Sequence, residues 1–324
     1  AVTGASKKTI NYAVKYANER KQFKTTISSF GAIQHKSAEM ATKIYVADAG
    51  NYRTGQNIED HIKRLEEKGL SPQDAKLQGA QEYAIECAVL KVFCSELVQF
   101  VSDESLQVYG GMGFSAESEV EACYRDARIS RIYEGTNEIN RLLIVKMILK
   151  KGMNEEINLM GPAKAVAKEI LSIPSHNKSS DELFLEEKMV LKNFKKAILL
   201  VAGSATEKLG SKLSEEQEIM MNISDMIIDT YMLESALLKT EKLIHKDGQN
   251  KHKEKIAICI NFLHYAADKL NKNGKEAIYA MANGDEQTIL LLGLKRFTKV
   301  KAVNLKNQRR IIAKKVIEEN KYCY

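Results

Sequence analysis

Apolar residues recur every three or four positions along almost the whole chain, with polar and charged residues between them. This spacing is typical of amphipathic helices, and no segment alternates apolar and polar residues convincingly as a strand would. In the first half, the segments interpreted as helices are residues 3–19, 31–55, 75–100 and 102–109, a segment holding Val120 and Cys123, and a helix that Thr136 can cap. Residues 22–30 are predicted to form an irregular link. Residues 57–74 are predicted to be an exposed, charged segment with a short helix and a turn. The pattern predicts an all-α protein.

The second half is predicted to form a separate helical domain. The pattern breaks at residues 151–162, so we divide the chain into domains 1–150 and 151–324. Residues 172–182 are expected to form a loop, because they combine proline, asparagine and serine. Amphipathic helices are predicted over residues 183–210, 214–244 and 253–272, followed by a shorter basic helical tail.

Composition agrees with a soluble helical chain. Hydrophobic residues make up 44% of the sequence and charged residues 28%, and only three prolines interrupt it. No apolar run reaches the roughly 18–20 residues of a membrane-spanning helix. Ala1 already lies within a helical pattern, so we expect the chain to be a piece of a longer protein.

The cysteines give no sign of a metal site or a disulfide framework. No two of the five form a C-x-x-C pair, and none lies near a histidine at metal-binding spacing. We interpret them as small apolar side chains, which favours a reducing compartment such as a bacterial cytoplasm.

Positive charge is concentrated at the end of the chain. The net charge is +7, and residues 288–324 hold ten basic residues against two acidic ones. This tail could make a peripheral contact with an acidic membrane surface. A solvated helix face or a contact with another subunit is the interpretation that we favour. No nucleic-acid binding is expected, because aromatic residues do not interleave the basic ones.

Four separated segments in the first half carry the candidate chemistry. They are NERKQF at 18–23, QVYGGMGF at 107–114, RDARISRIYEG at 125–135 and EGTNEINR at 134–141. Gly110 and Gly111 let the backbone approach a ligand closely, but taken alone they are better explained as a helix end. Arg20 could clamp a phosphate, but taken alone it is a surface arginine.

Glu134 is the strongest candidate for a catalytic residue in these segments. It lies between Tyr133 and Gly135, just before the expected helix start. An ordinary exposed acid is the simple interpretation of a single glutamate. A largely apolar pocket would instead desolvate the carboxylate and make it a better base.

Taken together, the four segments resemble the acyl-CoA dehydrogenase family. The motifs ERKQF, Q-x-x-GG-x-GF and R-I-Y-EGT-N-x-I-x-R occur in that order within about residues 1–150. The second helical domain is similar to the very-long-chain branch of that family. The resemblance implies a C-terminal four-helix bundle followed by an additional helical domain.

The resemblance also implies a reaction. Glu134 would be the catalytic base that removes the α-proton of a bound acyl thioester. A hydride would pass from the β-carbon to the flavin N5 of FAD, giving a trans-2-enoyl-CoA. Tyr133 and Gly135 would line the substrate. In the family, the backbone N–H of the base hydrogen-bonds the thioester carbonyl.

Further positions are expected to contact FAD. The resemblance implies this role for Arg20, Gln22, Phe23, Gln107, Gly110, Gly111, Thr136, Asn137 and Glu138. The segment holding Gln107 and the two glycines would reach across from a neighbouring subunit. A homodimer or tetramer with FAD at its interface is therefore implied, with an electron-transfer flavoprotein as the electron acceptor. Arg141, at the end of the motif, is read as a structural ion-pair partner.

The chain also departs from the family pattern. The family's N-terminal helical domain, its middle β-domain and the Asp/Arg segment that meets CoA are not in this sequence. Lys24 stands where the family usually has a glycine, which affects the backbone shape of that loop. We expect residues 1–324 alone neither to bind FAD tightly nor to turn over. The alternatives are a catalytically silent relative that acts as an assembly or scaffold protein, and an acyl-CoA oxidase.

Overall fold

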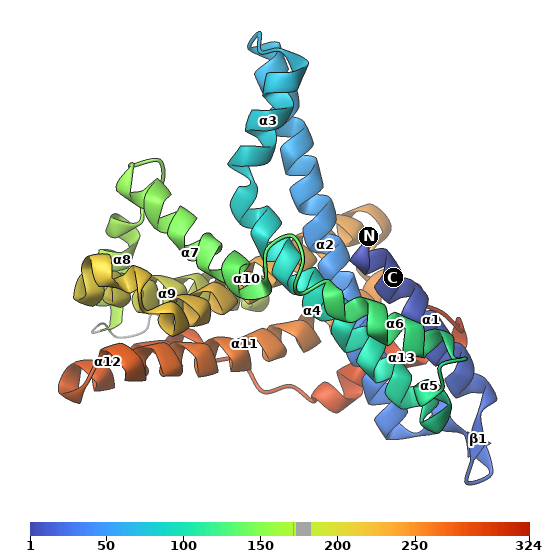
Figure 1. The fold of residues 1–324 in the computed structure, drawn as a ribbon. Coiled ribbons are helices and arrows are strands. Elements are labelled where there is room, and N and C mark those ends of the chain that lie inside the picture. Colours follow the sequence, from blue (N-terminus) through green and yellow to red (C-terminus); the bar gives the residue numbers. More distant parts are fainter. Residues whose placement is uncertain (171, 173–182) are drawn as a thin grey trace. The chain divides into compact units, whose positions relative to one another are not determined.

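Helices make up nearly all of the protein in the computed structural model, which describes residues 1–170, 172 and 183–324 (Figure 1). The predicted all-α class is confirmed. The first half contains α1 (Val2–Glu19), α2 (Gly31–Glu67), α3 (Pro72–Glu82), α4 (Ala84–Tyr109), α5 (Gly111–Phe114), α6 (Glu119–Ile129) and α7 (Asn137–Met153). The second half contains α8 (Met160–Ile170), α9 (Leu185–Leu209), α10 (Gln217–Asp247), α11 (Lys253–Met281), α12 (Gly284–Phe297) and α13 (Leu305–Glu318).

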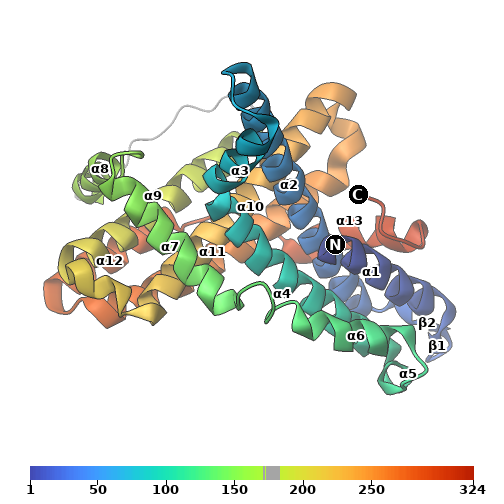
Figure 2. The same cartoon turned by 45° about the horizontal axis from the view of Figure 1, so that its top comes forward.

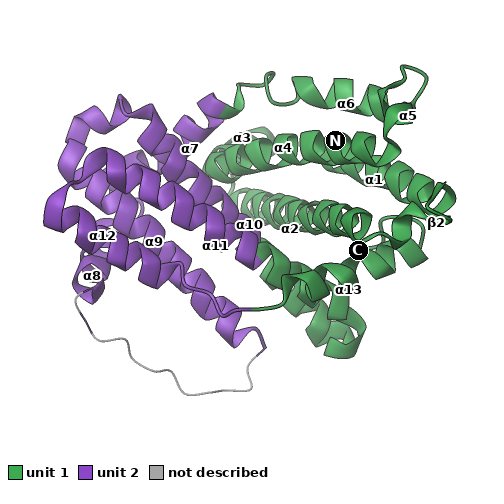
Figure 3. Ribbon diagram, turned by 90° about the horizontal axis from the view of Figure 1, so that it is seen from below, with its two compact units in different colours: residues 1–137, 235–262, 303–324 green, residues 138–234, 263–302 purple. Residues whose placement is uncertain are grey.

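The chain forms two compact units (Figure 3). Unit 1 comprises residues 1–137, 235–262 and 303–324, and unit 2 comprises residues 138–234 and 263–302. Helices α10 and α11 each contribute residues to both units, and the division into domains 1–150 and 151–324 stays a prediction. A helix of 31 residues such as α10 is about 46 Å long, more than the diameter of a small domain. Breaks in periodicity mark helix ends, but not which helices share a core.

Helices α1, α2, α4 and α13 contribute to the core of unit 1. In Figure 2, α1 runs along α4, and α6 also packs against α4. Helix α13 packs against α2. Ile10, Ile44, Val101 and Ile312 have no exposed surface, so each of these four helices contributes to the core. Burying a side chain of this size stabilises the fold by about 1.5–3 kcal/mol.

The exposed, charged segment predicted over residues 57–74 forms the tip of a helical hairpin made by α2 and α3. Helix α2 continues to Glu67, and Gly69 adopts a φ of 92° at the turn. The Ser71 hydroxyl caps α3 by accepting a hydrogen bond from the Asp74 backbone N–H at 3.1 Å. Helix α3 then returns along α2 (Figure 1), and Gly79 makes their close approach possible, because a Cβ there would lie 2.5 Å from the Ile62 side chain.

Three local predictions were wrong. The single helix predicted over residues 75–100 is divided at Tyr83, where α3 ends and α4 begins. Ser102 does not cap a helix, because α4 runs without interruption from Ala84 to Tyr109 and buries Ser102 completely. A serine is small enough to fit into an apolar interface between helices. The presence of a residue type that often caps helices therefore did not indicate a helix start at Ser102. The link after α1 is ordered: β1 (Lys21–Gln22) pairs antiparallel with β2 (Thr25–Thr26), and the 3-10 helix η1 (Ile27–Ser29) follows.

Unit 2 has its own core and internal ion pairs. Phe194, Met226, Leu270 and Phe297 are buried there. Arg141 Nε lies 2.8 Å from Asp225 Oδ1, which agrees with its interpretation as an ion-pair partner. The predicted loop 172–182 falls outside the described residues except for Ser172. Among the described helices, none is both long enough and apolar enough to cross a membrane.

Candidate active site

Glu134 lies in a tight turn between α6 and α7. Its backbone φ is 56°, and Gly135 follows with a φ of 81°. The left-handed region is uncommon for residues other than glycine and costs about 1–2 kcal/mol. The Glu134 side chain is exposed, and Tyr133 before it is half-exposed. The turn therefore exposes the Glu134 carboxylate to solvent, on a backbone in a strained conformation.

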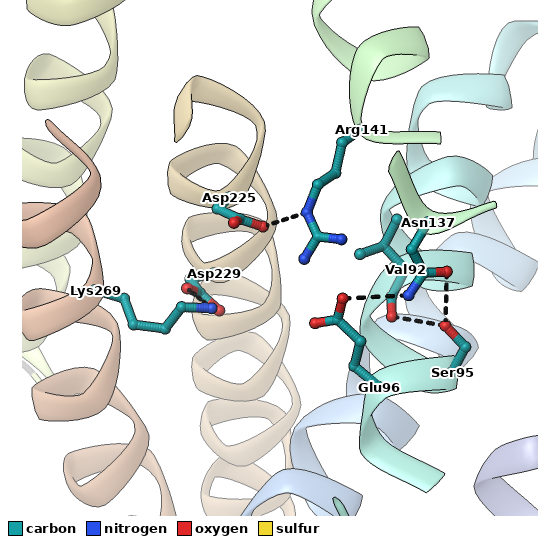
Figure 4. A network of polar contacts seen from close by, with 8 residues as sticks. All are labelled: Val92, Ser95, Glu96, Asn137, Arg141, Asp225, Asp229 and Lys269. Carbon is teal, nitrogen blue, oxygen red and sulfur yellow. Dashed lines mark hydrogen bonds and ion pairs between the residues drawn. The ribbon is translucent and has the colours of Figure 1, made fainter. Parts of the chain in front are cut away.

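Asn137 anchors this turn to α4. It is completely buried at the first position of α7, and its backbone N–H donates to the Arg131 carbonyl at 3.2 Å. Its side-chain Nδ2 donates to Glu96 Oε1 at 3.2 Å, and its Oδ1 accepts from Lys91 Nζ at 2.8 Å. The Ser95 hydroxyl lies 3.0 Å from the same Oδ1. Figure 4 shows Ser95 and Glu96 meeting Asn137 from α4.

A second buried serine strengthens the anchor. Ser130, at the end of α6, donates from Oγ to the Ala127 carbonyl at 2.7 Å and lies 3.3 Å from the Ser95 carbonyl. The turn from residue 130 to 137 is thus fixed at both ends to α4. Lys91, Ser95, Glu96 and Ser130 were missed in the sequence. Lys91 and Ser95, four residues apart on a helix with many apolar residues, were the available signal.

Apart from Glu138, which begins unit 2, the predicted cofactor residues fall into two groups within unit 1. Gln22 and Phe23 belong to the β-hairpin, and Gly110 and Gly111 lie at the α4–α5 junction. Figure 2 shows the hairpin and α5 at the same end of unit 1. Thr136 and Asn137 come after the C-terminal end of α6, whereas α5 comes before its N-terminal end. Since α6 has 11 residues, about 16 Å of helix separates the two groups in one chain.

The residues of the first group are open to a ligand. Arg20, Gln22 and Gln107 are exposed, and 89% of the Phe23 surface is exposed. Gly110 ends α4 with a φ of 61° and a ψ of −138°, a conformation that favours glycine. At Gly110 and Gly111 an added Cβ would meet no atom within 4 Å. Burial of Tyr109, which stacks on Tyr16 at 4.1 Å, raises its pKa to about 12.

The residues of the second group differ in burial. Glu134 is exposed, and the described residues do not enclose it in an apolar pocket. Asn137 has both side-chain polar atoms engaged with α4, so only its backbone is open to a cofactor, and its contact with FAD stays a prediction. Glu138 is exposed on the first turn of α7, where a carboxylate favours the positive helix end. Thr136 directly precedes α7, as a capping residue would.

Residues 1–149 and residues 193–296 each match a family described as an acyl-CoA dehydrogenase C-terminal domain. The chain therefore belongs to the acyl-CoA dehydrogenase family. A probable acyl-CoA dehydrogenase of Bacillus subtilis is 38% identical over 319 residues, which are 98% of this chain and 54% of that protein. The mouse mitochondrial very long-chain specific acyl-CoA dehydrogenase is 29% identical over 291 residues, covering 84% of this chain and 41% of the relative.

Similarity extends to a solved structure. The crystal structure of an acyl-CoA dehydrogenase complexed with FAD from Bacillus anthracis superposes with a TM-score of 0.94 at 38% identity, covering all of this chain and 55% of that one. The chain thus spans about half the length of the relatives that it matches.

Proposed function

We propose that the chain is the C-terminal part of a FAD-dependent enzyme that converts long-chain fatty acyl-CoA into trans-2-enoyl-CoA. The observation that carries this proposal is the anchored turn, which presents Glu134 outward on a strained backbone above the buried Asn137. Strain of this kind persists only where the surroundings enforce it, and it is often found at functional sites. Similarity to very long-chain specific relatives supports a long acyl chain.

In this proposal, Glu134 takes the α-proton of the acyl thioester onto its carboxylate. Such a proton is too weakly acidic for a free carboxylate in water, so the thioester carbonyl must be stabilised as charge develops on it. No hydrogen bond of the Glu134 backbone N–H occurs within residues 1–170, 172 and 183–324. That N–H is therefore available to donate to the thioester carbonyl, so that one residue supplies both the base and a carbonyl contact.

Several residues fit the binding of FAD. The open backbone at Gly110 and Gly111 can approach a dinucleotide closely, and the exposed Arg20 guanidinium suits a phosphate. The exposed Phe23 ring offers an apolar face to a planar group. When bound, FAD would supply the acceptor for the hydride that leaves the β-carbon. The proposed final acceptor is an electron-transfer flavoprotein.

A homo-oligomer with FAD at its interface is part of the proposal. One chain holds Gly110 and Glu134 beyond opposite ends of α6, and a single FAD would need its flavin near the base and its adenine half bound as well. A neighbouring subunit would supply Gln107, Gly110 and Gly111 to the FAD that lies beside Glu134. A dimer or tetramer is proposed on this basis.

The membrane contact predicted for residues 288–324 stays a prediction. Leu294 of α12 and Ile312 of α13 are buried within their own units, whereas Leu292 and Ile311 on the same two helices are exposed. An amphipathic helix needs an exposed apolar face to enter a membrane interface. The reducing compartment likewise stays a prediction.

The test is an anaerobic titration of the full-length, flavin-loaded protein with a long-chain acyl-CoA, followed by the visible flavin absorbance. We expect bleaching, and we expect Glu134→Gln to slow it at least about 10³-fold, because amide nitrogen cannot accept the proton. Glu155→Gln is the matched control, since Glu155 is also an exposed glutamate with a positive φ of 60°. This control should bleach at the normal rate.

Three other outcomes would change the assignment. A wild-type protein that stays yellow across all chain lengths would favour the scaffold interpretation. Rapid consumption of oxygen by the reduced protein would favour an acyl-CoA oxidase. Unchanged bleaching in Glu134→Gln would remove Glu134 as the base.

A further inference from the structure

A groove in unit 2 gathers positive charge. It has a volume of about 720 Å³ and lies between α9 and α12, beside the end of α8. Five basic residues border it, together with a single carboxylate, Glu169. The basic residues are Lys192, Lys196, Lys295, Arg296 and Lys299. None of them belongs to the positions proposed for FAD or for the base.

Internal ion pairs account for only part of this charge. Lys196 Nζ lies 2.6 Å from Glu169 Oε1, and Arg296 Nη2 lies 3.9 Å from the same oxygen. Arg296 Nη1 also donates to the backbone carbonyls of Glu169 at 3.0 Å and Ser172 at 2.9 Å. These contacts fix the guanidinium at the groove and leave one carboxylate shared between two cations.

Three of the lysines carry charge that no described side chain balances. Among the residues that the structure describes, Lys192, Lys295 and Lys299 have no hydrogen bond or ion pair. The carboxylate of Glu186, at the start of α9, is engaged by Lys301 at 3.1 Å. The described residues that line the groove therefore leave it with a net positive charge.

Helix electrostatics does not explain the arrangement by itself. Lys295 and Arg296 lie in the last turn of α12, where the helix dipole favours cations. Lys192 and Lys196 lie in the first half of α9, four residues apart, where like charges repel across one helical turn. The unfavourable pair on α9 faces the same groove as the cations of α12.

The groove also has an apolar part. Phe297 is buried at the groove, and Lys196 Nζ lies 5.6 Å and Arg296 Cζ 5.8 Å from its ring centroid. Leu292 is 60% exposed at the edge. A concave site of several hundred Å³ with an apolar surface and a few convergent polar groups has the character of a small-molecule site.

We propose that this groove binds a soluble small molecule that carries phosphate groups. A phosphate group brings nearly two negative charges and several acceptor oxygens, which suits lysines converging from two helices and a fixed guanidinium. The cations line the walls of a concave groove, whereas a membrane surface is met by a convex or flat face. A phosphorylated compound of limited size therefore fits better than a bilayer.

The test measures binding of pyrophosphate to the full-length, flavin-loaded protein by calorimetry at low salt. We expect saturable binding with one site per chain that weakens as salt increases, because ions screen the attraction. The double variant Lys192→Gln/Lys299→Gln should weaken it at least about tenfold, which is 1.4 kcal/mol. Thermal unfolding confirms that the exposed substitutions leave the fold intact.

Two control variants locate the binding. Lys195→Gln removes the same kind of charge from α9, but Lys195 pairs with Glu234 and does not border the groove. Arg20→Gln removes the cation proposed for FAD. Both should bind pyrophosphate as the wild type does. Equal weakening in Lys195→Gln, loss only in Arg20→Gln, or no saturable binding at all would overturn the proposal.

Vesicles separate a soluble ligand from a membrane. Co-sedimentation with vesicles of an anionic phospholipid should be the same for Lys192→Gln/Lys299→Gln and for Arg20→Gln/Lys195→Gln, which carry the same net charge. If only vesicle binding responds to the groove substitutions, while pyrophosphate binding does not, the groove is a membrane contact and the proposal fails.

Discussion

Two turns of unit 1 place consecutive residues in the left-handed region, but they are supported differently. Glu134 and Gly135 have φ values of 56° and 81°, and Phe23 and Lys24 have values of 49° and 67°. The first turn ends on the buried Asn137, which α4 holds through three side chains. The second connects two strands of only two residues each, and Phe23 is almost fully exposed.

The comparison shows two ways of accommodating the same strain. In the hairpin, two positive φ values are what a two-residue connection between twisted strands requires. Around Glu134 no strand pairing imposes the conformation, so the buried polar network must do so. We infer that the network exists to fix the carboxylate, whereas the hairpin geometry is local.

Removal of the anchor should have the largest effect on this contrast. Asn137→Ala leaves Lys91, Ser95 and Glu96 without their buried partner, and we expect it to lower the free energy of unfolding by about 2–4 kcal/mol. Urea denaturation measures the change. Asn154→Ala is the control, because Asn154 is exposed and bonds only the exposed Glu156 at 3.0 Å. Equal losses in both variants would show that the network does not hold the turn.

Relief of the strain at the site should have an intermediate effect. Glu134→Gly removes the cost of a left-handed glutamate, so we expect a gain in stability of about 1 kcal/mol together with loss of flavin bleaching. Glu134→Ala keeps the strain and should lose bleaching without that gain. A Glu134→Gly variant no more stable than Glu134→Ala would mean that the turn is relaxed.

Relief of the strain in the hairpin should have the smallest effect. Lys24→Gly restores a residue that adopts a φ of 67° freely, and we expect it to raise the unfolding free energy by about 0.4–1 kcal/mol. Lys21→Gly, in the extended strand β1, should instead destabilise the protein. Thermal unfolding of the two variants checks the sign. Destabilisation by Lys24→Gly would show that the lysine side chain, and not the backbone, matters there.

Local patterns were sufficient where the information is local. Helical periodicity identified the class of fold, because an amphipathic helix repeats its buried positions within a few residues. The C-terminal end of α4 followed from the glycine pair Gly110 and Gly111 directly after it. Ser102 failed as a predicted cap because its burial depends on helices far away in the sequence.

The sequence alone determined the helical class, the family motifs and the identity of the glutamate offered as base. Tertiary structure decided that α10 and α11 belong to two units, and that Asn137 is an internal anchor. It also brought together the lysines of α9 and α12, about a hundred residues apart in the chain. The physical reason is that periodicity records which side of a helix is buried, whereas partners and net charge in a groove depend on contacts between distant segments.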